Sequence, residues 1–237
     1  METGNEVKII HIKETDSTNE EVFRLKDKYK IPFFVVADIQ TSGRGRYGRV
    51  WESPEGGLWM TGLFKKRNNK DGFKFMFGSA VVVYKELKTL GVNARIKFPN
   101  DIYVGDKKIC GILVEEREGF LAVGIGLNVN QNRPPVEGST SIYIITGVLH
   151  DKIALAYNIG KGLMEVDRKN FSDVFKEYRN LLDTLGKYVR VYTPSDMYEG
   201  IFEDLTENLE VILRGEFINI IPAGEVFHLE ENYERGY

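Results

Sequence analysis

The pattern of apolar positions changes its period along the chain. Alternating or continuous apolar runs bounded by turn residues predict β-strands, and apolar positions three or four apart predict helices. The strands expected in the first part of the chain cover 7–12, 32–39, 56–64, 95–98, 101–104, 107–116 and 120–129. The expected helices cover 15–30, 73–91, 151–169 and 172–186, and the stretch 131–147 is expected to be rich in loops. Strands in close succession with few crossover helices favour an α+β fold with a mixed, largely antiparallel sheet.

Capping residues set the expected ends of the helices. Thr18 and Glu21 have the spacing of a capping box, which predicts the start of the first helix. Gly91 is expected to close the long second helix, because glycine is the residue preferred just after a helix end. Ser172 is expected to cap the last helix and Gly186 to stop it.

The predicted secondary structure changes after Gly186, from a mixture of helices and strands to strands alone. Five short strands separated by turn residues are predicted, with no helical pattern between them. They cover 188–193, 197–204, 209–214, 216–221 and 225–230. Such a run is typical of a small β-barrel. We therefore expect two domains, a larger one at 1–185 and a small C-terminal β-barrel at 186–237.

The composition is that of an ordinary globular protein. The 237 residues are 42% hydrophobic and 28% charged, and the formal net charge of −3 lacks the excess of positive charge that a general nucleic-acid binder carries. Cys110 is the only cysteine, which excludes an intrachain disulfide and a zinc site built from cysteines. No stretch has the features of a signal peptide or the length of a membrane span. We therefore expect a cytoplasmic protein that binds neither DNA nor a membrane.

One basic loop departs from this average composition. The stretch 43–49 places three arginines among three glycines, and its spacing fits the G-x-G-x-x-G of a dinucleotide-binding turn. A Rossmann turn needs a helix to begin at the third glycine, and Pro54, Gly56 and Gly57 argue against one. Glycine lets backbone N–H groups approach an anion, and arginine pairs with carboxylate and phosphate oxygens. The loop therefore favours an anionic small molecule, with a merely solvated loop as the alternative. We call it the arginine loop.

Four motifs in register give the chain a family resemblance. "DSTN" at 16–19, "QTSGRGRYGRVW" at 40–51, "KFPNDIYVGDKKICGILVE" at 97–115 and "GIGLNVN" at 124–130 together resemble the catalytic domain of biotin protein ligases. The C-terminal "PAGEVFHLE" at 222–230 resembles the small Src-homology-3-like barrel of that family. Family members that also repress transcription carry an additional N-terminal helix-turn-helix domain. With only about fifteen residues before "DSTN", this chain resembles the enzyme-only form.

The resemblance implies a two-step reaction. Members of the family activate biotin with ATP and Mg²⁺ to biotinyl-5′-AMP and pyrophosphate, and then transfer biotin to one lysine of a biotin carboxyl carrier protein. The first step brings an anionic carboxylate against an anionic phosphate, so cations must lie between them. The resemblance gives Arg44, Arg46 and Lys108 this catalytic role. The family includes monomers and homodimers, so either state is expected.

The resemblance also implies which residues bind biotin. A hydroxyl and an amide suit the neutral ureido ring of biotin. The implied set is Ser17, Thr18, Asn19, Gln40, Gly43, Arg44, Gly45, Arg46, Lys108, Gly111, Leu113 and Gly124. Helix capping is the alternative for Ser17 and Thr18. Lys107 would point to the opposite face of a strand from Lys108, so the two lysines are not interchangeable.

A second implied set binds ATP and the adenylate. It comprises Arg46, Arg49, Trp51, Asn100, Asp101, Lys108 and Asn128. Asp101 is the expected ligand of Mg²⁺, with a simple Pro-Asn-Asp turn as the alternative. Trp51 is expected either to form a wall over the adenine or to pack in the core. Phe98 stands where the family usually has tryptophan, which keeps an aromatic ring but loses an indole N–H.

Two other functions stay open from the residues. A lipoate ligase shares the fold and the acyl-adenylate chemistry, but lipoate has no ureido group to match "DSTN" and Gln40. A non-catalytic nucleic-acid binder would use the arginine loop and would show steep salt dependence without ATP turnover.

Overall fold

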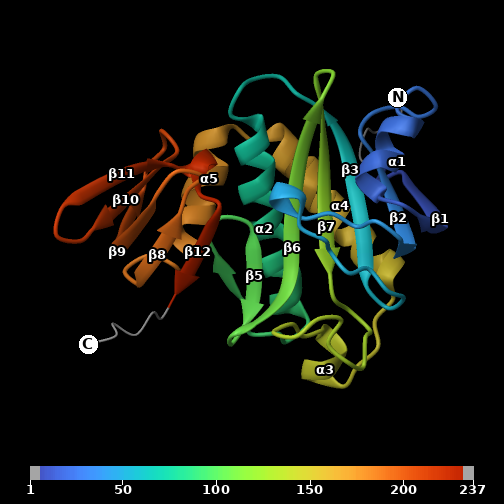
Figure 1. Ribbon diagram of the computed structural model, residues 1–237. Helices are drawn as coiled ribbons and strands as arrows, with labels where there is room; N and C mark the ends of the chain where they lie inside the picture. Colours follow the sequence, from blue (N-terminus) through green and yellow to red (C-terminus); the bar gives the residue numbers. More distant parts are fainter. Residues whose placement is uncertain (1–5, 232–237) are drawn as a thin grey trace.

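The computed structural model describes residues 6–231 and consists of two sheets packed side by side with helices on one flank (Figure 1). The larger sheet has the strand order β1-β2-β3-β7-β6-β5-β4. Its strands are β1 (Ile9–Thr15), β2 (Phe33–Gln40), β3 (Leu58–Lys65), β4 (Arg95–Lys97), β5 (Asp101–Val104), β6 (Lys107–Arg117) and β7 (Phe120–Leu127). Strands β1 and β2 pair parallel and the other described neighbours pair antiparallel. The prediction of a mixed, largely antiparallel sheet is confirmed.

Both faces of this sheet are covered over part of their area. Helices α2 (Asp71–Thr89), α4 (Lys152–Arg168) and α5 (Phe171–Leu181) lie behind the sheet in Figure 1. The short α1 (Thr18–Leu25) packs on the opposite face, where Val22 joins Phe33 and Val35 in a small core of its own. Alternate residues of β2 therefore point into two different cores, which explains why this strand is a continuous apolar run. Helix α1 contacts β2, β3 and β7, so it leaves the β6 side of this face to other parts of the chain.

The second sheet has the order β11-β10-β9-β8-β12 and pairs antiparallel throughout its described strands. Its strands are β8 (Tyr188–Tyr192), β9 (Met197–Leu205), β10 (Glu210–Arg214), β11 (Ile218–Pro222) and β12 (His228–Glu231). The five predicted strands are all present. Phe98 and Phe202 meet with ring centroids 5.3 Å apart, so the two sheets share one apolar core. The division into two domains stays a prediction, and its outer ends, 1–5 and 232–237, lie outside the described residues.

Three local expectations are wrong. Ser17, not Thr18, occupies the N-cap position of α1, and its side chain makes no capping hydrogen bond. Asn170, not Ser172, caps α5 by accepting from the backbone N–H of Asp173. That helix ends at Leu181, five residues before Gly186. The stretch 131–147 also contains a short helix, α3 (Ile142–Thr146). The closure of α2 by Gly91 is confirmed by the left-handed backbone of this glycine, with φ of 74°.

Helices α2 and α4 pack through a reciprocal pair of glycines. A Cβ added at Gly78 would lie 2.6 Å from Val166, and one added at Gly162 would lie 2.6 Å from Val82. Each helix thus offers a glycine to a valine of the other, which lets the two backbones approach closely. Valine is stiff at χ1, so it has little freedom to move away.

We expect Gly78→Ala to lower the free energy of unfolding by about 1–2 kcal/mol, because overpacking outweighs the gain in helix propensity. Gly72→Ala in the same helix is the matched control, since a Cβ there meets nothing within 4 Å. Urea unfolding of both variants measures the difference, and equal stability of the two would contradict this account of the packing.

Candidate active site

A cavity of about 520 Å³ opens on the α1 face of the larger sheet, between the arginine loop, the strand surface and the second sheet. Of the residues predicted for the site, all except Gly43 line it. These are Ser17, Thr18, Asn19, Gln40, Arg44, Gly45, Arg46, Arg49, Trp51, Asn100, Asp101, Lys108, Gly111, Leu113, Gly124 and Asn128. Gly43 does not line the cavity, and glycine is needed at this position for the folding of the loop. A Cβ there would lie 2.4 Å from the Trp51 carbonyl oxygen, so glycine lets the two arms of the arginine loop pair.

One end of the cavity is a network of neutral polar side chains. Thr18 donates to Gln40 Oε1 from its backbone N–H at 2.8 Å and its hydroxyl at 3.0 Å. Gln40 in turn donates to Ser53 Oγ at 2.8 Å. Ser17, Thr18 and Asn19 are all nearly fully buried. Since none of these side chains caps α1, this end of the cavity can hydrogen-bond a neutral polar ligand without burying a charge.

Sequence reasoning missed two neutral members of this network, Thr61 and Ser53, and one carboxylate that contacts it, Glu115. Thr61 donates to Asn19 Oδ1 at 2.6 Å, Glu115 accepts from Asn19 Nδ2 at 2.7 Å, and Ser53 accepts from Gln40. Thr61 did carry a signal, because it is a polar residue in the apolar run 58–64. Strand β7 leaves no room for a side chain next to Asn19, because a Cβ on Gly124 would lie 2.4 Å from Asn19 Oδ1.

Trp51 forms the middle wall of the cavity over two glycines. A Cβ on Gly111 would lie 2.8 Å from its ring, and one on Gly126 would lie 2.4 Å from its Nε1. The indole N–H has no hydrogen-bond partner among the described residues. Lys108 Nζ stands 5.2 Å from the ring centroid. This arrangement gives a flat aromatic surface with a cation over the ring, although a role toward adenine stays a prediction.

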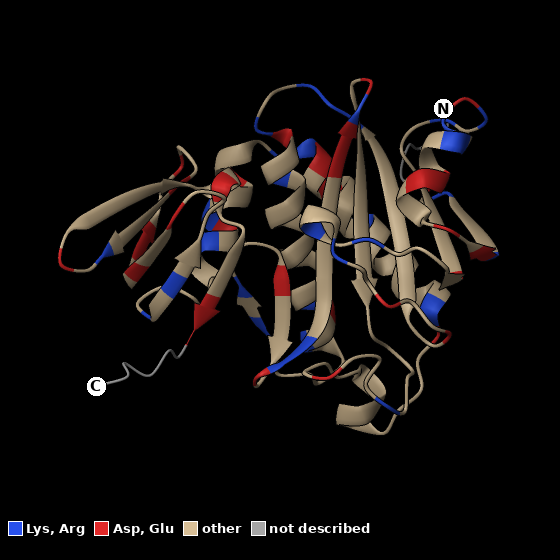
Figure 2. Ribbon diagram, viewed as in Figure 1, with Lys and Arg blue, Asp and Glu red and all other residues tan. Residues whose placement is uncertain are grey.

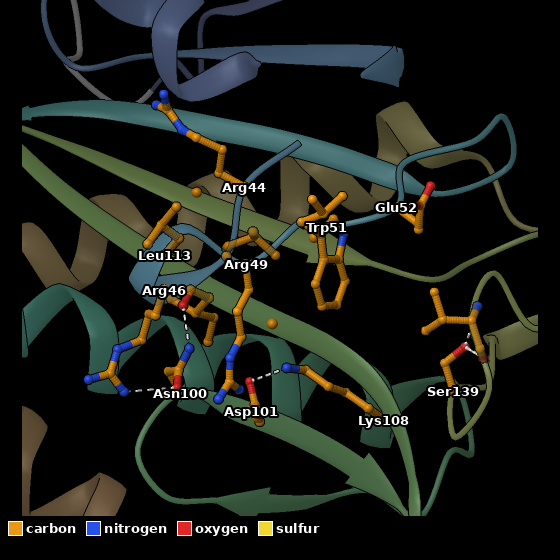
Figure 3. A pocket seen from close by; sticks show the side chains of 18 of the residues that line it. Arg44, Arg46, Arg49, Trp51, Glu52, Asn100, Asp101, Lys108, Leu113 and Ser139 are labelled. Carbon is orange, nitrogen blue, oxygen red and sulfur yellow. Dashed lines mark hydrogen bonds and ion pairs between the residues drawn. The ribbon is translucent and has the colours of Figure 1, made fainter. Parts of the chain in front are cut away.

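The other end of the cavity is charged. Lys108 Nζ lies 2.6 Å from Asp101 Oδ1, and Arg46 reaches Asn100 Oδ1 at 3.4 Å. In Figure 3, Arg49 extends toward the same pair of Asp101 and Lys108. Lys107, by contrast, is exposed and does not line the cavity. Two further groups were missed by sequence reasoning. Burial lowers the pKa of the Lys97 ammonium and raises the pKa of the Tyr103 hydroxyl to about 12, and both line this end.

Arg44 lies on the cavity but its guanidinium is turned away from the other cations (Figure 3). It donates to Glu20 at 2.7 Å and to Glu115 at 3.1 Å. Together with Arg117, the larger contributor, it lowers the pKa of Glu20 to about 2. Arg44, Arg46 and Lys108 therefore line one cavity, but the guanidinium of Arg44 points away from the other two cations. Arg44 ties the arginine loop to α1 and β6 in this structure, and its predicted contact with an anion stays a prediction.

Asn128 is also held by the protein. Its Nδ2 donates to the Thr140 carbonyl at 2.9 Å, and its backbone N–H donates to the Ile109 carbonyl at 3.0 Å. The side chain thus holds the end of the loop 131–141, which forms one side of the cavity mouth. Its predicted role at the adenine is not tested by these contacts.

Residues 224–227, which connect β11 to β12, contact Arg46 and Tyr47 of the arginine loop, and we call these contacts the latch. Arg46 Nη2 donates to the Val226 carbonyl at 3.0 Å, and the Tyr47 hydroxyl donates to the Val226 and Gly224 carbonyls at 3.2 and 3.3 Å. The Tyr47 and Phe227 ring centroids are 4.6 Å apart. Tyr47 has φ of 57°, an uncommon value for a residue with a side chain, so these contacts hold a costly backbone conformation. The sequence analysis gave Tyr47 no role.

Charge and metal chemistry set limits on the site. In Figure 2, segments coloured for Lys and Arg alternate along the ribbon with segments coloured for Asp and Glu. Within residues 6–231, no group of three or more His, Cys, Asp or Glu side chains could hold a metal ion. In the same range, none of the helices has the length and apolar character needed to cross a membrane.

Comparison with known proteins finds one family. Residues 9–132 match the family described as the biotin/lipoate A/B protein ligase family. The structure of the biotin protein ligase from Aquifex aeolicus in complex with biotin and ATP is 31% identical, with a TM-score of 0.81, over 94% of this chain and 99% of that one. The biotin–[acetyl-CoA-carboxylase] ligase of Paracoccus denitrificans is 29% identical over 235 residues, 97% of its length. The bifunctional ligase/repressor BirA of Bacillus subtilis is 41% identical over 105 residues, 32% of its length.

We expect Tyr47→Ala to open the arginine loop. The variant loses the hydroxyl bonds and the ring contact, about 1–2 kcal/mol, which raises the open population about five- to thirtyfold. Limited trypsin digestion, with cleavage after Arg44, Arg46 and Arg49 followed by mass spectrometry, measures this population. Tyr157→Ala is the control, since Tyr157 is exposed to a similar degree, 41% against 46%, on α4. Equal cleavage rates in the two variants would show that the latch does not hold the loop.

Proposed function

The chain belongs to the biotin/lipoate A/B protein ligase family, and on that premise we propose that it is an ATP-dependent biotin–protein ligase. It activates biotin to biotinyl-5′-AMP with release of pyrophosphate, and then transfers biotin to a lysine of a biotin carboxyl carrier protein. The observation that carries this proposal is a single cavity that joins a neutral hydrogen-bonding end to a cationic end. A vitamin with a neutral ring and an anionic tail needs both.

At the neutral end, Thr18 and Gln40 bind the ureido ring. An amide and a hydroxyl offer both donors and acceptors, and the ring has two N–H groups and one carbonyl. Lipoate has no ureido group, so it offers no hydrogen-bond partner to the amide of Gln40, which Ser53 already holds in position. This end therefore favours biotin over lipoate.

At the cationic end, Lys108 and Arg46 lower the repulsion between the biotin carboxylate and the α-phosphate of ATP. Two like charges at bonding distance repel by several kcal/mol unless cations lie beside them. The Asp101 carboxylate holds the Lys108 ammonium in place at 2.6 Å before the substrates arrive. A cation held in position costs little reorganisation when charge develops next to it.

Mg²⁺ would enter with the nucleotide. This ion commonly binds through one or two carboxylates together with substrate phosphates, and the described residues offer Asp101 in the cavity but no cage of three ligands. The donor set fits that mode. Bound there, the ion would neutralise phosphate charge, with Asp101 and Asn100 as its neighbours. A cytoplasmic location, expected from the single cysteine, stays a prediction, as does the oligomeric state.

The test is direct. The chain is incubated with biotin, MgATP and a carrier domain, and the carrier is weighed by mass spectrometry. One added biotinyl group supports the proposal. Biotin-dependent and lipoate-dependent ATP–pyrophosphate exchange are then compared; faster exchange with lipoate, or none with either acid, would overturn it.

We expect Lys108→Ala to lower biotin-dependent pyrophosphate exchange by about 10²-fold or more, the scale of one lost transition-state donor. Lys107→Ala serves as the matched control and is expected to change the rate by less than about twofold, because that side chain is exposed and lies outside the cavity. Similar losses in the two variants would refute the role of Lys108.

We expect Arg46→Gly to weaken retention of biotinyl-5′-AMP. The variant loses the bonds to Asn100 and Val226, so the arginine loop closes less well over the adenylate, a mixed anhydride that water hydrolyses. Release is followed by filtration of the radiolabelled complex and by labelling of lysines on an unrelated protein. Release at the parent rate would contradict this assignment.

A further inference from the structure

The mouth of the cavity carries exposed apolar side chains. Tyr47, Val50, Val136 and Phe227 all line the cavity, yet they are 46%, 75%, 47% and 38% exposed. They come from three separate segments: the arginine loop and its continuation, the loop 131–141, and the connection between β11 and β12. We call these four side chains the apolar rim.

Apolar side chains in such positions need an explanation other than the cavity itself. A Val50 that is three-quarters exposed is not packed against the wall, so it adds nothing to the closure of the cavity. Contiguous exposed apolar surface on a soluble protein commonly marks a contact with another molecule. Here the surface surrounds the opening through which any second substrate must pass.

Charge around the same opening does not favour one sign. The exposed charged residues of the lining are Arg44, Arg49, Glu52, Asp106 and Glu137. These two cations and three carboxylates differ by one charge, so a partner that docks here gains little from electrostatic steering and more from apolar burial.

We propose that the apolar rim is the docking surface for the carrier domain, which presents its target lysine between apolar side chains. This inference rests on the proposed function. The lysine ammonium sits at the end of a four-carbon stem, so it reaches an adenylate inside the cavity only when the carrier backbone lies against the mouth. Val50 and Val136 contact the carrier from two sides, and the latched rings of Tyr47 and Phe227 contact it from the third.

The double variant Val50→Thr with Val136→Thr tests the proposal. Threonine keeps the shape and the β-branched backbone preference of valine and adds a hydroxyl that burial against an apolar partner would leave unpaired. Val148→Thr is the matched control, because Val148 is 53% exposed but lies outside the cavity lining. Two activities are measured on each protein: biotin-dependent pyrophosphate exchange, which needs no carrier, and transfer to the carrier.

In the double variant we expect the KM for the carrier to rise about tenfold, while exchange stays within about twofold of the parent. The Val148 variant should match the parent in both activities. For the parent enzyme, raising NaCl from about 50 to about 500 mM should change the KM for the carrier by less than about threefold, since apolar contacts are not screened.

Two results would overturn the inference while leaving the proposed function intact: normal exchange with an unchanged carrier KM, or a double variant that alters self-association in sedimentation while carrier KM stays the same. The second result would assign the rim to contacts between copies of this chain. Absence of biotin-dependent exchange in the parent would instead overturn the proposed function itself.

Discussion

The close approach of the arginine loop to the strands β6 and β7 is the constraint on which the cavity depends. Gly111 and Gly126 leave no side chains on the strand surface, and the Trp51 ring occupies the space that a Cβ at either position would need. Gly43 allows the loop to fold back on itself against Trp51 and Ser53. Glycine at these places matters because of what lies against it, and any larger residue would push the loop away from the sheet and open the cavity.

The charges of the site follow from the same packing. Glu20 and Glu115 hold Arg44 at the outer side of the loop, which leaves Arg46 and Lys108 as the cations at the charged end. Asn100 lies just before β5 and Asp101 is its first residue. Because these two residues fix Arg46 and Lys108, the positions of the cations come from the larger sheet and not from the loop alone. These contacts hold the two cations in position before an anion binds, which lowers the reorganisation that binding requires.

The second sheet belongs to the site as much as the first. Its connection 223–227 accepts hydrogen bonds from Arg46 and Tyr47, and Phe227 packs against the Tyr47 ring. A loop rich in glycine and in like charges resists ordering, since three arginines repel and glycine loses the most conformational freedom. The latch offsets part of that cost, and it places exposed apolar side chains at the mouth of the cavity.

Most of the strands and helices could be predicted from apolar periodicity, because burial imposes a period on each element, and the five strands after Gly186 are the clearest case. The motifs fixed which residue types line the cavity. The caps were less predictable: Asn170 and Ser172 are both good caps, and Thr18 turned out to bond Gln40 instead of the helix. The direction of Arg44, the network through Thr61, and the meeting of Arg46 with Val226, 180 positions away, were decided by the tertiary structure. Local pattern reports whether a side chain is buried, whereas its partner depends on the path of the whole chain.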